Sequence, residues 1–119
     1  MNNQRYSIFC DFDGTIGYHY GDLQSMATET PQILPGVKEK FDEWNERGCY
    51  IIITTARPQS MEQLTREHLH TMGLKYDRLI MEVTNLPRVL INDRKPYTDV
   101  DAAQAIIVER DKGFKDLRI

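Results

Sequence analysis

YSIFCDFDGT, residues 6–15, is the stretch that decides the fold of this chain. Its first half is a run of mainly apolar and aromatic residues with the length and character of a buried β-strand. Asp11 and Asp13 follow at the end of that run, and Gly14 marks a turn. Since residues two apart share a face of an extended chain, both carboxylates are expected to enter one crevice. A divalent cation with oxygen ligands is the simplest way to hold two such charges together.

The composition indicates one ordinary globular domain over residues 1–119. Hydrophobic residues make up 40% of the chain and charged residues 28%, which suits a single core. The formal net charge of −3 argues against a nucleic-acid partner that is held by a broad basic surface. No apolar stretch approaches a membrane span, and residues 1–5 lack a signal-peptide core. Cys10 and Cys49 are interpreted as core thiols, so the sequence predicts a cytoplasmic protein without a membrane partner.

Strand and helix patterns alternate along the chain. A helix is expected between Gly36 and Gly48, with Val37, Phe41 and Trp44 on one stripe. Further helices are expected over residues 60–72 and 98–105. Apolar runs predict five strands, at residues 6–10, 50–53, 78–81, 88–91 and 106–108.

This alternation predicts an α/β fold of three layers, Rossmann-like, with a mostly parallel five-stranded sheet and helices on both faces. The unbroken apolar run at residues 50–53 is typical of a strand that is covered on both sides. In such sheets ligands bind outside the carboxyl ends of the strands. Asp11, Asp13, Thr55 and Asp93 all follow predicted strands, so the sequence predicts that they meet at one edge.

Three segments at these strand ends resemble motifs of the haloacid dehalogenase-like (HAD) hydrolases, and the chain resembles a small phosphatase of that superfamily without a cap domain. DFDGT at residues 11–15 resembles the first motif, TTAR at residues 54–57 the second, and IND at residues 91–93 the fourth. The alternative for the first segment is an Asp-Gly turn with Asp11 as a helix cap. The resemblance spans residues 8–99, which is most of the chain.

The resemblance implies a Mg²⁺-dependent phosphatase. Asp11 would be the nucleophile that becomes an aspartyl phosphate, and Asp13 the general acid and base. Mg²⁺ would be held by Asp11, Asp93 and the backbone carbonyl of Asp13. Thr55, with Thr54 as the fallback, and the amides near Asp13 and Gly14 would bind the phosphoryl oxygens.

The expected motif with a lysine is missing after the third predicted strand. Residues 81–85 read MEVTN, so Lys95 is the nearest substitute for a phosphate-binding cation, with Arg94 also possible. No segment between the motifs is long enough for a cap, which favours a homo-oligomer or a large substrate that excludes water. A small phosphorylated metabolite such as a sugar phosphate is the expected substrate. A polynucleotide end phosphatase and a non-catalytic phosphate-binding regulatory domain are the alternatives.

Overall fold

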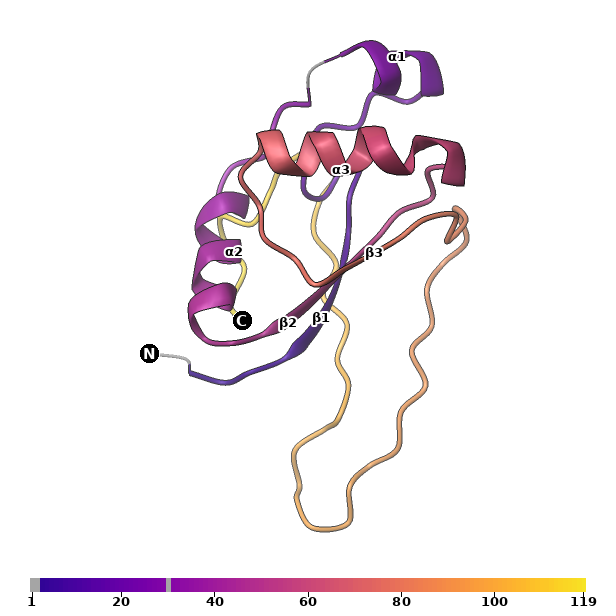
Figure 1. Cartoon of the computed structure of the whole chain (residues 1–119). Coiled ribbons are helices and arrows are strands. Elements are labelled where there is room, and N and C mark those ends of the chain that lie inside the picture. The colour runs from indigo at the N-terminus through magenta and orange to yellow at the C-terminus, as the bar shows by residue number, and fades with distance from the viewer. Residues whose placement is uncertain (1–2, 30) are drawn as a thin grey trace.

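The computed structural model describes residues 3–29 and 31–119. Met1 and Asn2, which belong to the N-terminal stretch judged to lack a signal-peptide core, lie outside the described residues, as does Thr30. The described residues form three strands, three α-helices and one turn of 3₁₀-helix: β1 (Ser7–Asp11), α1 (Leu23–Thr28), α2 (Val37–Glu46), β2 (Tyr50–Thr54), η1 (Gln59–Met61), α3 (Glu62–Thr71) and β3 (Arg78–Ile80). Figure 1 shows their arrangement.

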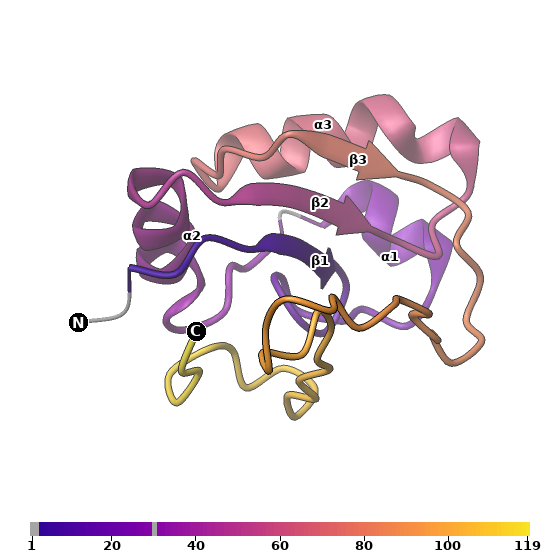
Figure 2. The same cartoon turned by 90° about the horizontal axis from the view of Figure 1, so that it is seen from below.

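The three strands form one parallel sheet in the order β1-β2-β3. Figure 2 shows them side by side and pointing the same way. Asp11 is the last residue of β1 and stands opposite Thr54, the last residue of β2. The ends of both strands therefore carry polar side chains to the same edge of the sheet, as the sequence predicts.

One face of the sheet is buried and the other is open. The buried face packs in one hydrophobic cluster with residues of α2 and α3, among them Phe41, Trp44 and Leu69. On the open face Phe9 is 57% exposed, and Tyr50 and Ile80 are exposed as well. The prediction that helices cover both faces is therefore wrong for the described residues, and the sheet and its helices form two layers.

The local patterns between residues 36 and 80 give the helices and strands that they predict, whereas α1 lies in a segment that the sequence indicates to be irregular. Val37, Phe41 and Trp44 all face the core from α2. Gly48 follows the end of that helix with a φ of 77°, a left-handed conformation that glycine adopts at low cost. Cys10 and Cys49 are both buried and free, as predicted.

The five-stranded sheet is contradicted, because the described residues form a sheet of three strands. Residues 82–107 form a long arm without helix or strand (Figure 1). The predicted strands at residues 88–91 and 106–108 and the predicted helix at residues 98–105 are therefore wrong. Val89 is 83% exposed and Ile91 is 91% exposed, so the apolar runs of the arm lie in solvent. A β-strand forms only where the backbone of an adjacent strand hydrogen-bonds to it. The apolar composition of residues 88–91 and 106–108 favours a strand but does not supply that adjacent strand.

Two backbone turns explain how the chain leaves the sheet. The amides of Glu82 and Val83 bond to the carbonyl oxygens of Arg57 and Thr55, which fixes the start of the arm beside the end of β2. Glu82 and Thr84 then have φ values of 60° and 71°, which redirect the chain.

The C-terminal segment returns to the body of the domain. Phe114 is buried, and its ring centroid lies 5.9 Å from that of Trp44. The Phe114 amide bonds to the carbonyl of Pro35 over 2.8 Å, at the entrance to α2. No helix in the described part of the chain has the length and apolar content needed to cross a bilayer.

Candidate active site

Asp11 lies at the carboxyl end of β1, with its side chain about half exposed. Its Oδ2 accepts a hydrogen bond of 3.2 Å from the Thr15 hydroxyl, and its Oδ1 lies 3.9 Å from a guanidinium nitrogen of Arg88. Burial raises the pKa of the Asp11 carboxyl above the usual 3.8, and the charge of Asp13 adds to the rise. The hydrogen bonds from the Phe12 amide and Thr15, and the charge of Arg88, oppose it.

The turn after β1 is built on one carbonyl group. The Phe12 oxygen accepts hydrogen bonds from the amides of Thr15, Ile16 and Gly17, at 3.0, 2.8 and 3.3 Å. Gly14 has a φ of 87°, and its amide bonds to the Gly17 oxygen at 2.7 Å. The Gly14 amide, which the sequence assigns to phosphate, is thus used within the loop. The tight turn fixes the backbone that carries Asp13.

Asp13 is held by a buried arginine. Arg57 Nε donates to Asp13 Oδ2 and Arg57 Nη2 donates to Asp13 Oδ1, each over 2.8 Å. Arg57 is only 3% exposed, and its guanidinium lies 4.5 Å from the centroid of the Phe12 ring. A two-pronged contact of this kind fixes both position and rotation of a carboxylate. Arg57 belongs to the TTAR segment, but nothing in the sequence indicates which acid it binds.

Thr54 and Thr55 occupy different surroundings. Thr55 is 1% exposed, and its hydroxyl oxygen accepts a hydrogen bond of 3.1 Å from the Arg57 amide. Thr54 is partly exposed and stands opposite Asp11 in the strand register. Paired residues of parallel strands project to the same face, so Thr54 is the hydroxyl residue beside Asp11. The assignment of phosphate binding to Thr55 stays a prediction, and the geometry favours the fallback, Thr54.

Asp93 and Lys95 lie on the arm. Lys95 Nζ contacts Asp93 Oδ1 at 2.6 Å, and both side chains are exposed. Within residues 3–29 and 31–119, no three His, Cys, Asp or Glu side chains gather closely enough to hold a metal ion. Asp93 is therefore not brought to Asp11 and Asp13. The Mg²⁺ site that the sequence predicts therefore lacks its Asp93 ligand in this structure, and Asp11 and Asp13 are the predicted ligands that remain at the end of β1.

Two arginines border Asp11 and its turn. Arg88 approaches Asp11 from the arm, and its other guanidinium nitrogen, Nη1, donates to the Leu86 carbonyl oxygen. Arg110 packs over Gly14, where an added Cβ would lie 3.2 Å from Arg110 Cγ. Sequence reasoning missed both, because Arg88 stood in a predicted strand and Arg110 in the charged C-terminal tail.

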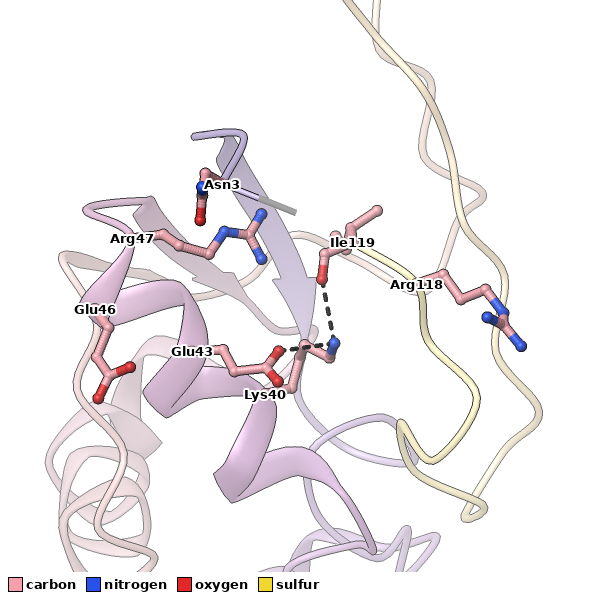
Figure 3. A pocket seen from close by; sticks show the side chains of 7 residues that line it. All are labelled: Asn3, Lys40, Glu43, Glu46, Arg47, Arg118 and Ile119. Carbon is pink, nitrogen blue, oxygen red and sulfur yellow. Dashed lines mark hydrogen bonds and ion pairs between the residues drawn. The ribbon is translucent and has the colours of Figure 1, made fainter. Parts of the chain in front are cut away.

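A cavity lies away from these residues. It has a volume of about 720 Å³ and is lined by Asn3, Lys40, Glu43, Glu46, Arg47, Arg118 and Ile119, at the amino ends of the strands (Figure 3). The Lys40 ammonium is paired there with Glu43 at 2.9 Å and bonds the Ile119 oxygen at 3.2 Å. Arg47 donates twice to the Gln4 carbonyl. These cations are engaged, and the cavity contains none of the predicted site residues.

Comparison with known proteins gives a likeness of fold. No protein-family model matches the chain, and no curated protein is similar to it. Among solved structures, a chain of the Pnkp1/Rnl/Hen1 complex has a similar fold, with a TM-score of 0.58 and 23% sequence identity. The match covers 71% of this chain and 30% of that chain, so this protein spans under a third of its structural neighbour. At this identity the likeness concerns the fold alone.

Proposed function

We propose that this protein is a phosphomonoester hydrolase in which Asp11 attacks phosphorus and Asp13 transfers protons. The observation that carries the proposal is the fixed position of Asp13, whose two oxygens are both held by buried Arg57. Asp11, with its half-exposed carboxylate, lies two residues away at the carboxyl end of β1. One accessible carboxylate beside one oriented carboxylate suits the two roles that the HAD resemblance implies.

The first step transfers the phosphoryl group to the protein. An oxygen of Asp11 forms a bond to phosphorus while the bond from phosphorus to the alcohol oxygen breaks, which leaves an aspartyl phosphate. For this step Asp13 carries a proton on one oxygen while its other oxygen keeps a hydrogen bond from Arg57, and it gives that proton to the departing alkoxide, which leaves as the alcohol.

The second step returns both carboxylates to their starting state. A water oxygen bonds to phosphorus while Asp13 takes a proton from that water, and the bond from phosphorus to Asp11 breaks. Inorganic phosphate leaves, and Asp11 is again a free carboxylate. The two hydrogen bonds from Arg57 suit the ionised form of Asp13 that accepts this proton.

Positive charge at the site supports phosphate binding. Arg88 lies 3.9 Å from Asp11, and Arg110 lies beside Gly14. Fixed cations offset the repulsion between an anionic nucleophile and an anionic phosphate. Mg²⁺ remains part of the expectation from sequence, and an assay with and without metal tests it separately.

A small phosphorylated metabolite is the proposed substrate, and a homo-oligomer in the cytoplasm is the proposed setting. The free, buried thiols of Cys10 and Cys49 suit a reducing compartment. The second candidate is a polynucleotide end phosphatase. It is favoured by the fold likeness to a chain of the Pnkp1/Rnl/Hen1 complex and by the arginines that border Asp11.

The deciding experiment compares the wild-type protein with Asp11→Asn on an aryl phosphate, on sugar phosphates and on 3′- or 5′-phosphorylated oligonucleotides. The wild type should release phosphate, and Asp11→Asn should lose turnover by at least about a thousandfold, since an amide is a poor nucleophile. Asp42→Asn on the surface of α2 is the matched control. Rapid quench with labelled substrate should place phosphate on Asp11.

Each outcome separates the candidates. Label on another residue would contradict the mechanism, and binding of phosphate without turnover would favour the non-catalytic domain. A preference for oligonucleotides over sugar phosphates would favour the second candidate. Parallel assays with Mg²⁺ and with excess chelator test the metal, and full activity in chelator would contradict the cofactor prediction.

A further inference from the structure

Arg57 also binds two side chains of α3, Thr65 and His68. Arg57 Nη1 donates to the Thr65 hydroxyl oxygen at 3.0 Å and lies 3.1 Å from His68 Nδ1. A guanidinium has donors and no acceptor, so His68 Nδ1 must be the acceptor. The ring is therefore the tautomer that carries its proton on Nε2.

Both residues come from one face of α3, three positions apart, and both are buried. Their contacts use Nη1, whereas Asp13 uses Nε and Nη2. The guanidinium is planar and rigid, so fixing Nη1 on one side fixes the two donors that face Asp13 on the other.

We infer that Thr65 and His68 are positioning residues that orient the Asp13 carboxylate through Arg57. The inference rests on the proposed function, because it assigns them a role in proton transfer by Asp13. If either acceptor is removed, a buried Nη1 donor is left without a partner, and the guanidinium turns to recover a hydrogen bond. The Asp13 carboxylate then turns with it, while Asp11 keeps its place on β1.

The electrostatics of His68 support this arrangement. Burial and the neighbouring charge of Arg57 lower the pKa of His68 below its usual 6.5, against smaller opposite effects of Asp13 and Glu67. A neutral imidazole can accept from Nη1, whereas an imidazolium would place a second cation against the guanidinium.

The test uses variants that keep the shape and remove or retain the acceptor. Thr65→Val keeps the volume and removes the hydroxyl, and Thr65→Ser restores it. His68→Leu removes the acceptor, and His68→Asn supplies an amide oxygen close to the place of Nδ1. His70→Leu is the control, because His70 is exposed on the same helix.

The readout is kcat/KM for two substrates that differ in their leaving group. A nitrophenolate leaves without help, whereas an alkoxide needs the proton of Asp13. Thr65→Val and His68→Leu should therefore lose about tenfold or more on the alkyl phosphate and less than about threefold on the nitrophenyl phosphate, in line with the usual size of general acid catalysis. Thr65→Ser and His68→Asn should recover most of the loss.

Equal losses on both substrates, or none, would overturn the positioning role while leaving the proposed function in place. A wild-type protein inactive on both substrates would overturn the proposed function and this role together. The ¹⁵N shifts of the His68 ring give a readout apart from activity. They should report a proton on Nε2 alone, and a proton on Nδ1 would contradict the contact with Arg57.

Discussion

Arg57 and Asp13 lie 44 positions apart in the chain and meet through two hydrogen bonds of 2.8 Å. The side chain of Arg57 is 2% exposed and that of Asp13 is 12% exposed, so water screens this pair poorly. The pair ties the turn after β1 to the segment that follows β2. It is therefore a structural link between two strands as well as a part of the candidate active site.

Removing one partner of this pair should destabilise the fold strongly. Arg57→Ala leaves the Asp13 charge unpaired and is expected to lower the free energy of unfolding by about 3–5 kcal/mol. Urea unfolding, monitored by the fluorescence of the one tryptophan, Trp44, measures the change. Arg66→Ala breaks the exposed pair with Glu62 and should cost less than about 1 kcal/mol.

A double-mutant cycle tests whether the two residues act as a unit. The variant with both Arg57→Ala and Asp13→Ala should lose clearly less stability than the sum of the two single variants, because no unpaired charge remains. Simple additivity would mean that the contact contributes little to stability.

The surroundings of Asp11 predict that its contribution to folding stability changes with pH in the opposite direction to that of a carboxylate in an ion pair. Burial raises the pKa of Asp11 in the folded state above its unfolded value near 3.8. The folded state thus holds the proton more tightly, and this group lowers stability progressively as pH rises from about 3.8 through the raised pKa. Asp11→Asn should therefore be more stable than the wild type at neutral pH, with the difference shrinking below pH 4.

Asp22 provides the comparison of opposite sign. Its carboxylate caps α1 by accepting from the Ser25 amide, and this hydrogen bond lowers its pKa. Asp22 therefore stabilises the fold above the pKa that it has in the unfolded state. This stabilisation is lost as the pH falls through the lower pKa of the folded state. Urea unfolding of the wild type, Asp11→Asn and Asp22→Ala between pH 3 and pH 8 checks both signs. An Asp11→Asn variant that is less stable at neutral pH would contradict the burial argument.

Arg88 and Lys95 are the two candidates for the phosphate-binding cation that the missing lysine would supply. Arg88 lies 3.9 Å from Asp11, whereas Lys95 is paired with Asp93 on the arm. Arg88→Ala should therefore lower kcat/KM by about tenfold or more, as removal of a fixed charge beside a phosphate does. Lys95→Ala should change it by less than about threefold. The reverse ranking would restore the role that the sequence assigns to Lys95.

The sequence predicts the fold well where neighbouring residues decide the structure. Val37, Phe41 and Trp44 define α2 by their spacing, and all three face the core. The sequence predicts the fold poorly where the structure of a segment depends on a distant segment that must pair with it. The run at residues 88–91 has the composition of a strand, but no strand pairs with it in the part of the chain that the structure describes.

The same limit applies to the candidate site. Asp11 and Asp13 can be recognised from DFDGT, because one strand and one turn place them together. The Arg57–Asp13 pair and the acceptors on α3 cannot be read from the sequence, since they depend on how β2 and α3 pack around the turn. The prediction for Asp93 depends on a strand at residues 88–91, and Asp93 lies on the arm because that strand does not form.

Gly113 lies in the turn that returns the C-terminal segment to α2. Gly113 has a φ of 80°, and a Cβ added there would overlap the carbonyl oxygen of Pro35 and lie 2.9 Å from its nitrogen. The positive φ and the overlap with Pro35 each destabilise the fold when any side chain replaces the glycine. The neighbouring Phe114 amide bonds to the same Pro35 carbonyl. Gly113→Ala should therefore lose about 1–2 kcal/mol from the backbone conformation, and about 1–3 kcal/mol more from the overlap.

Gly21 separates these two contributions. Its φ is 90°, but the nearest atom to an added Cβ is His19 Cε1 at 4.0 Å, so Gly21→Ala has the backbone penalty without the overlap. Urea unfolding should rank wild type above Gly21→Ala and Gly21→Ala above Gly113→Ala. The near-ultraviolet signal of Trp44 should change only in Gly113→Ala, because the ring of Phe114 packs against it. Equal stability of the two variants would mean that the segment around Gly113 shifts freely away from Pro35, and that Phe114 is not anchored by this turn.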